Sequence, residues 1–348
     1  MSQKQLYNYK LIPEFSYKQH RHNTALAINY SNTMLFVADE ITILVFQFKN
    51  ELKKLQQVKS HSSKITTLNV FKQQSGLISA SHDGSIILWS QIINPNFKYL
   101  ARLKGHTDQI TCLVLHPFSN KLIISGSNDK SIKFWTFNYS QFQNQSSSSW
   151  SCSQTISRHN ASVSEISINQ DGNKLLSCAE KQIMIMNYSD SNQWQVKQLI
   201  QISDVGVRLS FINDYLFAYQ PWSGKSIHIY ILDSIEEEYI KSREIPIQGE
   251  KDPCWFYFPS LYVPSKNILI CKNGHKVNVL QFTFSQFGWK CNLEQSIDYG
   301  HNWIFGTLSE DGQYLITSDW LSKSIQIRQL TQQEEIQQFV KNNINYYL

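Results

Sequence analysis

Short apolar stretches alternate with polar turns along almost the whole chain. The apolar runs are 5–8 residues long, are rich in Ile, Val, Leu, Phe and Tyr, and are divided by Gly, Asn, Asp, Ser or Pro. Runs of this length and composition between turn-forming residues predict β-strands. No long segment with helical periodicity interrupts them. The pattern therefore predicts an all-β fold made of many short strands.

The strand pattern is repeated. Residues 61–89 align almost without gaps with residues 106–135, and each stretch runs from a His, through Ser-x-Ser and an Asp turn, to a Trp. Further copies start at His159 and His301, and an earlier one starts at His22. The 142 residues between His159 and His301 hold three repeats, two of them degenerate. Seven repeats therefore fit the chain.

These repeats resemble those of the WD-repeat family, which implies a single seven-bladed β-propeller. The last repeat supplies only three strands before Leu330, whereas residues 6–16 alternate like an outer strand. We expect residues 6–16 to complete the last blade, because an open ring would leave a long unpaired strand edge. Residues 1–330 are then the propeller domain.

The last residues, 331–348, show a different pattern. Thr331 and Glu334 fit a capping box, which predicts a short amphipathic C-terminal helix. Its apolar face would contain Ile336, Phe339, Val340, Ile344 and Tyr347. A helix this short must pack against something, and the alternatives are its own propeller and a groove on a partner.

Two repeats contain residue types that occur in Ser–His–Asp hydrolases. The resemblance to the family implies a structural chain instead: Asp holds His, His meets a Ser hydroxyl, and Ser accepts from the Trp indole N–H. Buried polar groups are tolerated when each has a partner. The set also occurs twice, whereas a catalytic site is usually single. The predicted sets are His61, Ser79, Asp83 and Trp89, and His106, Ser125, Asp129 and Trp135, with Ser81 and Ser127 as alternatives for the serines.

Other repeats depart from this pattern. The repeat at His159 has Glu180 near the Asp position and Met186 or Tyr188 at the Trp position, and the repeat at His301 has Arg328 there. We expect such blades to depend on apolar packing.

Composition excludes several classes of protein. Apolar residues make up 41% of the chain, which is enough for a large core, and the net charge of +5 is too small for a dense phosphate-binding surface. No apolar run reaches the ~18–20 residues of a membrane span. The six cysteines lie far apart, and no nucleotide-binding or hydrolase motif occurs. We therefore predict no catalytic, cofactor-binding or metal-binding residues, and no cofactor.

The 32 scattered glutamines are interpreted as compositional bias.

Four tryptophans fall in loop segments of the last three blades. These are Trp222, Trp255, Trp303 and Trp320. Exposed aromatic residues are typical anchors of protein interfaces, so they are the predicted partner site. The alternative is that the rings pack on one another and plug degenerate blades. Nearby lysines suggest a basic rim: Lys225, Lys251, Lys272, Lys276 and Lys323.

The resemblance implies a non-catalytic scaffold that mediates protein–protein interactions in a multi-subunit complex. Fold alone does not determine function. The alternatives are a nucleic-acid-binding propeller that uses a basic, aromatic face, and an adaptor of cytosolic iron–sulfur protein assembly. We expect other proteins as partners rather than nucleic acid. We expect an intracellular location, with the cytoplasm favoured over the nucleus.

Overall fold

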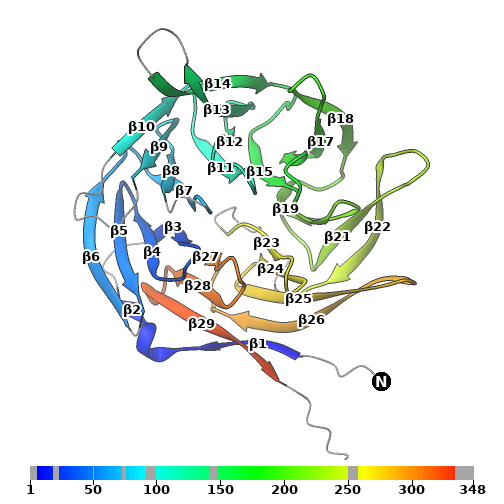
Figure 1. The fold of residues 1–348 in the computed structure, drawn as a ribbon. Helices are drawn as coiled ribbons and strands as arrows, with labels where there is room; N and C mark the ends of the chain where they lie inside the picture. Colours follow the sequence, from blue (N-terminus) through cyan, green and yellow to red (C-terminus); the bar gives the residue numbers. More distant parts are fainter. Residues whose placement is uncertain are drawn as a thin grey trace, which may run out of the picture.

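The computed structural model describes residues 6–18, 23–49, 51–72, 76–90, 99–140, 147–249 and 258–333. These residues form seven antiparallel sheets arranged as a ring (Figure 1). The predicted seven-bladed, all-β propeller is thus confirmed. Within the described ranges, no helix is long and apolar enough to cross a membrane.

Six blades are built from four consecutive strands, ordered from the centre outwards. Blade 1 contains β3 (Asn23–Ile28), β4 (Met34–Asp39), β5 (Thr42–Phe48) and β6 (Leu52–Lys59). Blade 2 contains β7 (Ile65–Val70), β8 (Leu77–Ser81), β9 (Ser85–Trp89) and β10 (Tyr99–Lys104). Blade 3 contains β11 (Ile110–Leu115), β12 (Leu122–Ser127), β13 (Ile132–Ser140) and β14 (Ser147–Ile156). Blade 4 contains β15 (Val163–Ile168), β16 (Lys174–Ala179), β17 (Gln182–Tyr188) and β18 (Trp194–Gln201). Blade 5 contains β19 (Gly206–Asn213), β20 (Leu216–Pro221), β21 (Ser226–Leu232) and β22 (Tyr239–Pro246). Blade 6 contains β23 (Leu261–Val263), β24 (Ile268–Asn273), β25 (Lys276–Ser285) and β26 (Gly288–Asp298).

The last blade joins the two ends of the described chain. Blade 7 contains β27 (Ile304–Leu308), β28 (Tyr314–Asp319) and β29 (Ser324–Gln333), and β1 (Leu6–Leu11) pairs with β29 as its outer strand. Figure 1 shows β1 lying along β29 at the edge of the ring. The N-terminal segment therefore completes blade 7.

The expected boundaries of this blade need two corrections. Residues 6–16 are not one strand: β1 ends at Leu11, a 3-10 turn (η1, Pro13–Phe15) follows, and β2 (Tyr17–Lys18) pairs with the start of β29. Proline interrupts the strand because it has no N–H to donate to the ladder.

The second correction concerns the end of the last repeat. Strand β29 continues to Gln333, and the Thr331 hydroxyl donates to the carbonyl of Asn8 at 2.9 Å. Thr331 is therefore a strand residue and not the cap of a helix. The expected helical face, from Ile336 to Tyr347, lies outside the described residues.

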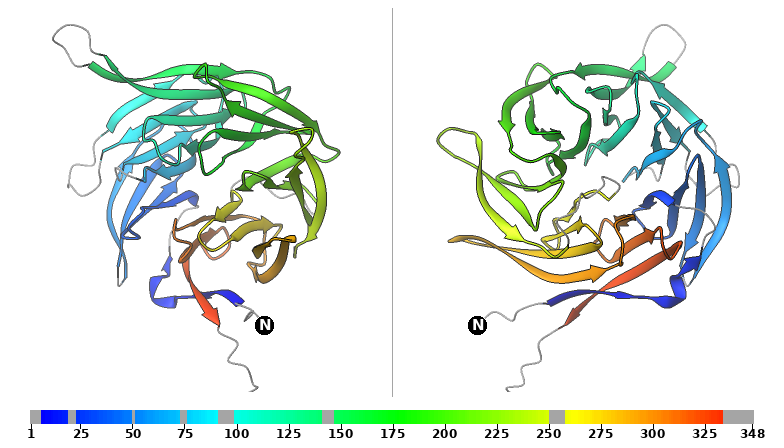
Figure 2. Two further views of the ribbon diagram at one scale, coloured as in Figure 1. Left: turned by 45° about the vertical axis from the view of Figure 1, so that its right-hand side comes forward. Right: turned by 180° about the vertical axis from the view of Figure 1, so that it is seen from behind.

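Packing between blades explains the apolar sequence pattern. The second and third strands are covered on both faces by neighbouring blades, so β8 and β9 are buried along their whole length. Apolar clusters accordingly join adjacent blades, as in the cluster that includes Phe36, Ile43, Ile65 and Trp89. The long β25–β26 hairpin projects from the ring in the right-hand view of Figure 2.

The connections lie at two opposite ends of the propeller. At the upper face, each outer strand leads to the next blade and each second strand turns into the third. At the lower face, the first strand turns into the second and the third into the fourth.

Candidate interaction site

The His–Ser–Asp–Trp residues of blades 2 and 3 form hydrogen-bond chains. His61 Nδ1 lies 3.0 Å from Asp83 Oδ2, His61 Nε2 lies 2.8 Å from Ser79 Oγ, and Trp89 Nε1 donates to Ser79 Oγ at 3.0 Å. In blade 3 the matching distances, for His106, Asp129, Ser125 and Trp135, are 2.7, 2.8 and 2.9 Å. Ser81 and Ser127 donate to carbonyls of Ser63 and Asp108 instead.

The charge states within these chains follow from burial. Burial lowers the pKa of His61 and of His106, although the aspartate beside each ring opposes this effect. Burial would raise the pKa of Asp129, but hydrogen bonds from Ser131 and His106 hold that pKa at about 2. A neutral imidazole therefore donates from Nδ1 to a carboxylate and accepts the Ser hydroxyl proton at Nε2. Ser79 and Ser125 are fully buried, so neither hydroxyl is open to a substrate.

Blade 4 keeps half of this chain. His159 Nε2 lies 2.7 Å from Ser177 Oγ, and His159 Nδ1 lies 2.8 Å from Gln182 Oε1. Gln182 and not Glu180 takes the place of the aspartate, because the tight turn projects Glu180 into solvent. Met186 occupies the Trp position and is fully buried.

Blade 7 replaces the tryptophan with Arg328. The Arg328 guanidinium donates to Tyr299 Oη at 2.8 Å and to Thr317 Oγ1 at 3.2 Å, and it lies over the Tyr299 ring. Tyr299 Oη in turn donates to Thr317 Oγ1 at 2.9 Å. This blade therefore contains a polar network and does not depend on apolar packing alone.

Two of the four predicted partner-binding tryptophans lie together on the upper face of blade 7. Trp303 is 38% exposed and Trp320 is 47% exposed, and their ring centroids are 5.8 Å apart. Leu321, which is 73% exposed, follows directly in the chain. We call these three residues the aromatic patch. Sequence reasoning missed Leu321, although its position in the polar turn SDWLSK was a usable signal.

The other two tryptophans are not part of this patch as described. Trp222 is half-buried in the β20–β21 turn of blade 5, and Trp255 lies outside the described residues. The lysines do not form a continuous rim either. Lys272 is buried in β24, Lys276 pairs with Asp298 at 3.8 Å, and Lys251 is not described. Lys225 and Lys323 remain exposed.

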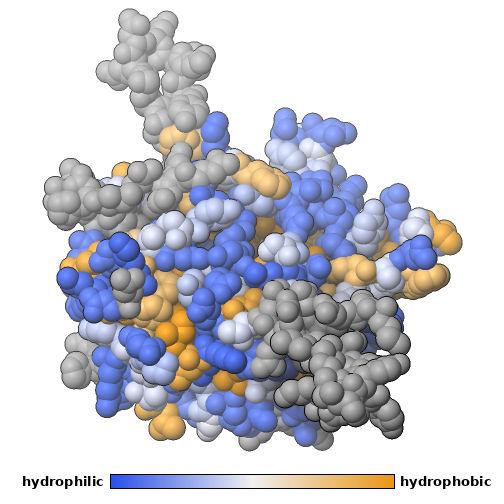
Figure 3. Space-filling view, turned by 60° about the horizontal axis from the view of Figure 1, so that its bottom comes forward, coloured by the Kyte–Doolittle hydropathy of each residue, from blue (hydrophilic) through white to orange (hydrophobic). Residues whose placement is uncertain are grey.

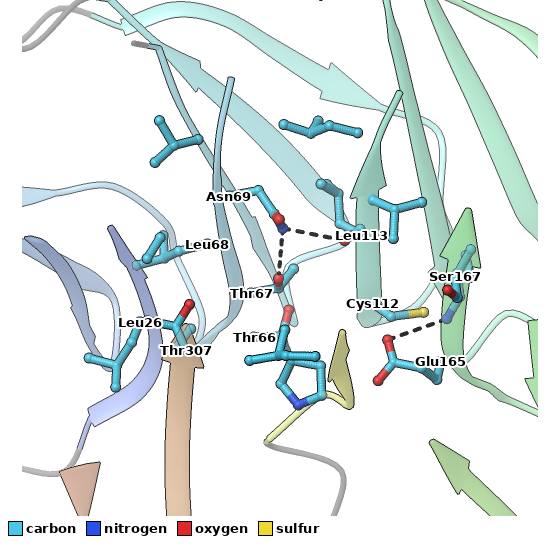
Figure 4. A pocket seen from close by; sticks show the side chains of 18 of the residues that line it. Leu26, Thr66, Thr67, Leu68, Asn69, Cys112, Leu113, Glu165, Ser167 and Thr307 are labelled. Atoms are coloured by element: carbon cyan, nitrogen blue, oxygen red, sulfur yellow. Dashed lines mark hydrogen bonds between the residues drawn. The ribbon is translucent and has the colours of Figure 1, made fainter. Parts of the chain in front are cut away.

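The innermost strands surround a cavity of about 510 Å³ in the centre of the ring. Residues of β7, β11 and β15 approach it in Figure 4, and Glu165 projects into it. Burial raises the pKa of the Glu165 carboxyl to about 8, and the charge of Arg208 only partly offsets this effect. The described residues contain no cluster of His, Cys, Asp and Glu that could hold a metal ion.

Hydroxyl groups at β-bulges link the blades around this cavity. A bulge occurs beside Thr24, Thr111 and Ser164 in three innermost strands. Each hydroxyl donates to a carbonyl of the next blade: Thr24 to Ile65, Thr111 to Val163, and Ser164 to Gly206. The bulge turns these side chains towards the neighbouring blade, which makes the ring a rigid support for its loops.

Comparison with known proteins agrees with this geometry. The family model described as "WD domain, G-beta repeat" matches residues 52–90, 97–136 and 150–187. Each matched range includes all or part of an outer strand and the three inner strands of the following blade. The sequence repeat is thus offset by one strand from the structural blade.

Similar curated proteins share only part of their length with this chain. Pre-mRNA-processing factor 19 of Mus musculus is 29% identical over 140 residues, which are 38% of this chain and 25% of that protein. Nuclear distribution protein PAC1 of Candida tropicalis is 40% identical over 73 residues, or 17% of this chain and 15% of that protein. Zinc finger CCCH domain-containing protein 62 of Arabidopsis thaliana is 35% identical over 65 residues, or 18% and 15%. The aligned part is thus a quarter or less of each relative.

Proposed function

Because the chain belongs to the WD40-repeat β-propeller family, we propose that it is a non-catalytic scaffold that binds other proteins within a multi-subunit complex. Its main partner site in this proposal is the aromatic patch on the upper face of blade 7. The single observation that supports this choice most strongly is the exposure of two adjacent indoles beside an exposed leucine. Large apolar side chains grouped in this way are typical of interface centres.

The loops that present the patch are held in place by hydrogen bonds. Trp303 N–H donates to His301 Nδ1 at 3.1 Å, and His301 Nε2 lies 3.0 Å from Asp319 Oδ1. The backbone N–H of Trp320 donates to the carbonyl of Trp303 at 3.0 Å. The two loops that carry the indoles are therefore tied to each other through their backbones, and a pre-organised loop lowers the entropy cost of binding.

One face of the molecule can be compared with this choice of a local anchor. On the face drawn in Figure 3, hydrophobic side chains form separate patches between hydrophilic ones. The relatives' names, pre-mRNA-processing factor and nuclear distribution protein, fit a role inside cells. The proposal includes an intracellular location, in the cytoplasm, and a fluorescent fusion distinguishes this from the nucleus.

The nucleic-acid alternative has less support. It requires several free cations beside the aromatic rings, because most of the affinity for nucleic acid comes from contacts with phosphates. Of the five lysines, Lys272 is buried and Lys276 is in an ion pair, which leaves Lys225 and Lys323 exposed among the described ones.

The partner-site proposal is tested by the double substitution Trp303→Ala and Trp320→Ala. The tagged full-length chain is used to recover partners for mass spectrometry, and the double variant should recover the principal partner at least about tenfold less. The matched control is Tyr30→Ala with Phe118→Ala, which removes two rings of 63% and 65% exposure from the lower face.

Three results separate the alternatives. Loss of the partner in the double variant, with a normal melting curve, supports the proposal. Unchanged recovery with a normal melting curve contradicts it. Loss of folding favours the view that the indoles act as plugs and that partners bind elsewhere.

A further inference from the structure

Two hairpins of neighbouring blades project from the same side of the ring, and each exposes a large apolar side chain at its turn. They are the β25–β26 hairpin of blade 6 and the β21–β22 hairpin of blade 5 (Figure 1). Phe287, in the turn of the first, is 91% exposed, and Ile235, in the turn of the second, is 86% exposed. No other large hydrophobic side chain of the described residues is as exposed as these two. Apolar groups presented so far from the core are typical of interfaces.

The hairpin of blade 6 is long, and its turn is fixed by hydrogen bonds. β25 has 10 residues and β26 has 11, whereas β21 and β22 of blade 5 have 7 and 8. We call residues 283–290 the aromatic finger. The Ser285 hydroxyl accepts from the N–H of Phe287 at 3.3 Å and donates to the carbonyl of Gly288 at 3.2 Å. The turn that presents Phe287 is therefore ordered before any partner binds, which lowers the entropy cost of binding.

Further rings support the base of the finger. Phe284 is 43% exposed and stacks on the buried Phe282, with ring centroids 6.3 Å apart. Phe284 is also paired across the hairpin with Trp289, and the Arg243 guanidinium of blade 5 lies 4.2 Å from the centroid of that indole. The finger thus presents two exposed phenylalanines on a base that is packed against the ring.

The finger and the turn of the blade 5 hairpin have opposite charges. Residues 276–293 contain no Asp or Glu, and Lys290 is exposed in the finger. We call residues 233–238 the acidic turn, because four of its six residues are Asp233, Glu236, Glu237 and Glu238. The three glutamates are exposed, and no ion pair among the described residues involves them or Lys290. These charges can therefore pair across an interface.

The two hairpins do not satisfy each other within one copy of the chain. Their tips diverge in Figure 1, and no hydrogen bond, ion pair or ring contact joins residues 233–238 to residues 283–290 in the described part of the chain. Because the hairpins are neighbours on one side of the ring, a two-fold axis would bring the finger of each copy against the acidic turn of the other. The surface is thus complementary to itself in both hydrophobicity and charge.

We propose that this chain forms a symmetric dimer in which the aromatic finger of each copy packs against the acidic turn of the other. Phe284 and Phe287 cover Ile235 of the second copy, and Lys290 pairs with its glutamates. An anionic membrane fits this surface less well, because four carboxylates would face a negatively charged lipid layer. The dimer interface is separate from the aromatic patch, which lies on the upper face of blade 7.

Sedimentation velocity of the full-length chain, from about 1 to about 300 µM, measures the association. We expect a reversible monomer–dimer equilibrium with a dissociation constant in the micromolar range, as for a small interface. Phe287→Ser should weaken dimerisation at least about tenfold, because each dimer loses two apolar anchors. The matched control is Leu100→Ser on β10 of blade 2, where the leucine is 64% exposed. This variant, and the double variant Trp303→Ala with Trp320→Ala, should dimerise like the wild type.

Reversal of charge tests the pairing of finger and turn. One variant is Lys290→Glu, and the other combines Glu236→Lys, Glu237→Lys and Glu238→Lys. Each variant alone places like charges opposite each other twice in the dimer and should dimerise at least about fivefold more weakly than the wild type. In a mixture of the two, every finger of a heterodimer faces a turn of opposite charge. The mixture should therefore associate more tightly than either variant alone.

Melting curves establish that each variant is folded, and the charge variants keep the test decisive should Phe287→Ser fail to fold. A wild-type chain that stays monomeric at every concentration would overturn the proposal. A dimer that neither Phe287→Ser nor charge reversal weakens would overturn it as well. Binding of a monomeric chain to vesicles of phosphatidylcholine and phosphatidylserine, with loss of binding in Phe287→Ser, would replace the dimer by a membrane contact.

Discussion

Asp129 determines how the turn and the histidine of blade 3 are held together. Its carboxylate accepts from His106 Nδ1 at 2.7 Å, from the backbone N–H groups of Thr107 and Ser131 at 3.1 and 2.9 Å, and from the Ser131 hydroxyl at 2.6 Å. One ionised side chain thus satisfies four donors at the junction of two loops. Bonds to a charged acceptor are stronger than neutral ones.

Substitution of Asp129 should therefore affect stability and not chemistry. Asp129→Ala leaves the buried His106 N–H without an acceptor and should lower the free energy of unfolding by about 1–3 kcal/mol. Asp108→Ala is the control in the same loop, because the Asp108 side chain is exposed and, among the described residues, its carboxylate accepts from the neighbouring Gln109 N–H. Chemical denaturation measures both variants. Equal stability of Asp129→Ala and the wild type would contradict the structural role.

The pH dependence of this difference has a definite sign. The pKa of Asp129 is about 2 in the folded chain and 3.8 for a free side chain. The group's contribution to stability is therefore complete above about pH 4 and is lost as the pH falls towards 2. The gap between wild type and Asp129→Ala should close over that interval.

At the level of elements, contacts between neighbouring outer strands give the glutamines a structural role. Three of the 32 glutamines form what we call a clasp: the glutamine amide donates to the carbonyl of an aromatic residue in the next blade, and that residue's N–H donates back to the glutamine oxygen. The pairs, all at the outside of the ring, are Gln154 with Trp194, Gln198 with Tyr239, and Gln295 with Tyr9. At the equivalent position of blade 5, Arg243 lies over the Trp289 ring of blade 6 at 4.2 Å. The glutamines scattered along the sequence therefore include three that form the same pair of hydrogen bonds, in addition to any compositional bias.

The clasp of Gln295 acts on the strand that closes the ring. Gln295→Ala removes two hydrogen bonds to Tyr9 and should lower the free energy of local opening of β1 by about 1–2 kcal/mol. Hydrogen exchange at Leu6–Leu11 should then accelerate roughly five- to thirtyfold. Gln198→Ala breaks the same clasp between blades 4 and 5 and should leave exchange in β1 unchanged. Equal exchange in β1 for both variants would show that Gln295 does not anchor this strand.

At the level of the whole molecule, the repeated strand pattern in the sequence predicts the blades. Contacts that occur once, between residues far apart in the chain, could not be predicted from it. The number of repeats followed from short apolar runs and the spacing of histidines, and the resemblance to the WD-repeat family implied their arrangement as a seven-bladed propeller. The link between Gln154 and Trp194 could not be predicted, because it joins residues 40 positions apart without a local signature. Thr331 was misassigned because a capping box is a local pattern, whereas pairing with Asn8 depends on the other end of the chain. The burial of Lys272 was missed because the basic rim was inferred from proximity in the sequence, which does not reveal that this side chain lies inside β24.

Bonds between blades also belong to this scale. Hydroxyl groups link three pairs of neighbouring blades at the centre of the ring, and glutamines link three pairs at its outside. Bonds at both distances from the centre oppose movement of one blade against the next and so favour a rigid ring, which presents the aromatic patch of blade 7.

This rigidity depends on closure by the N-terminal strand, so deletion of residues 1–18 should destabilise the whole ring. Tyr7 and Tyr9 are 8% and 2% exposed and belong to an apolar cluster with Phe258, Ile304 and Leu330. Burial of each tyrosine contributes about 1.5–3 kcal/mol, so the melting temperature should fall by more than about 5 °C. Removal of β1 also exposes the edge of β29, and concentration-dependent aggregation should follow. Deletion of residues 1–5 is the control, because it leaves the whole of β1 (Leu6–Leu11) in the chain. A chain without residues 1–18 that melts and stays monomeric like the full-length protein would mean that blade 7 is stable without its outer strand.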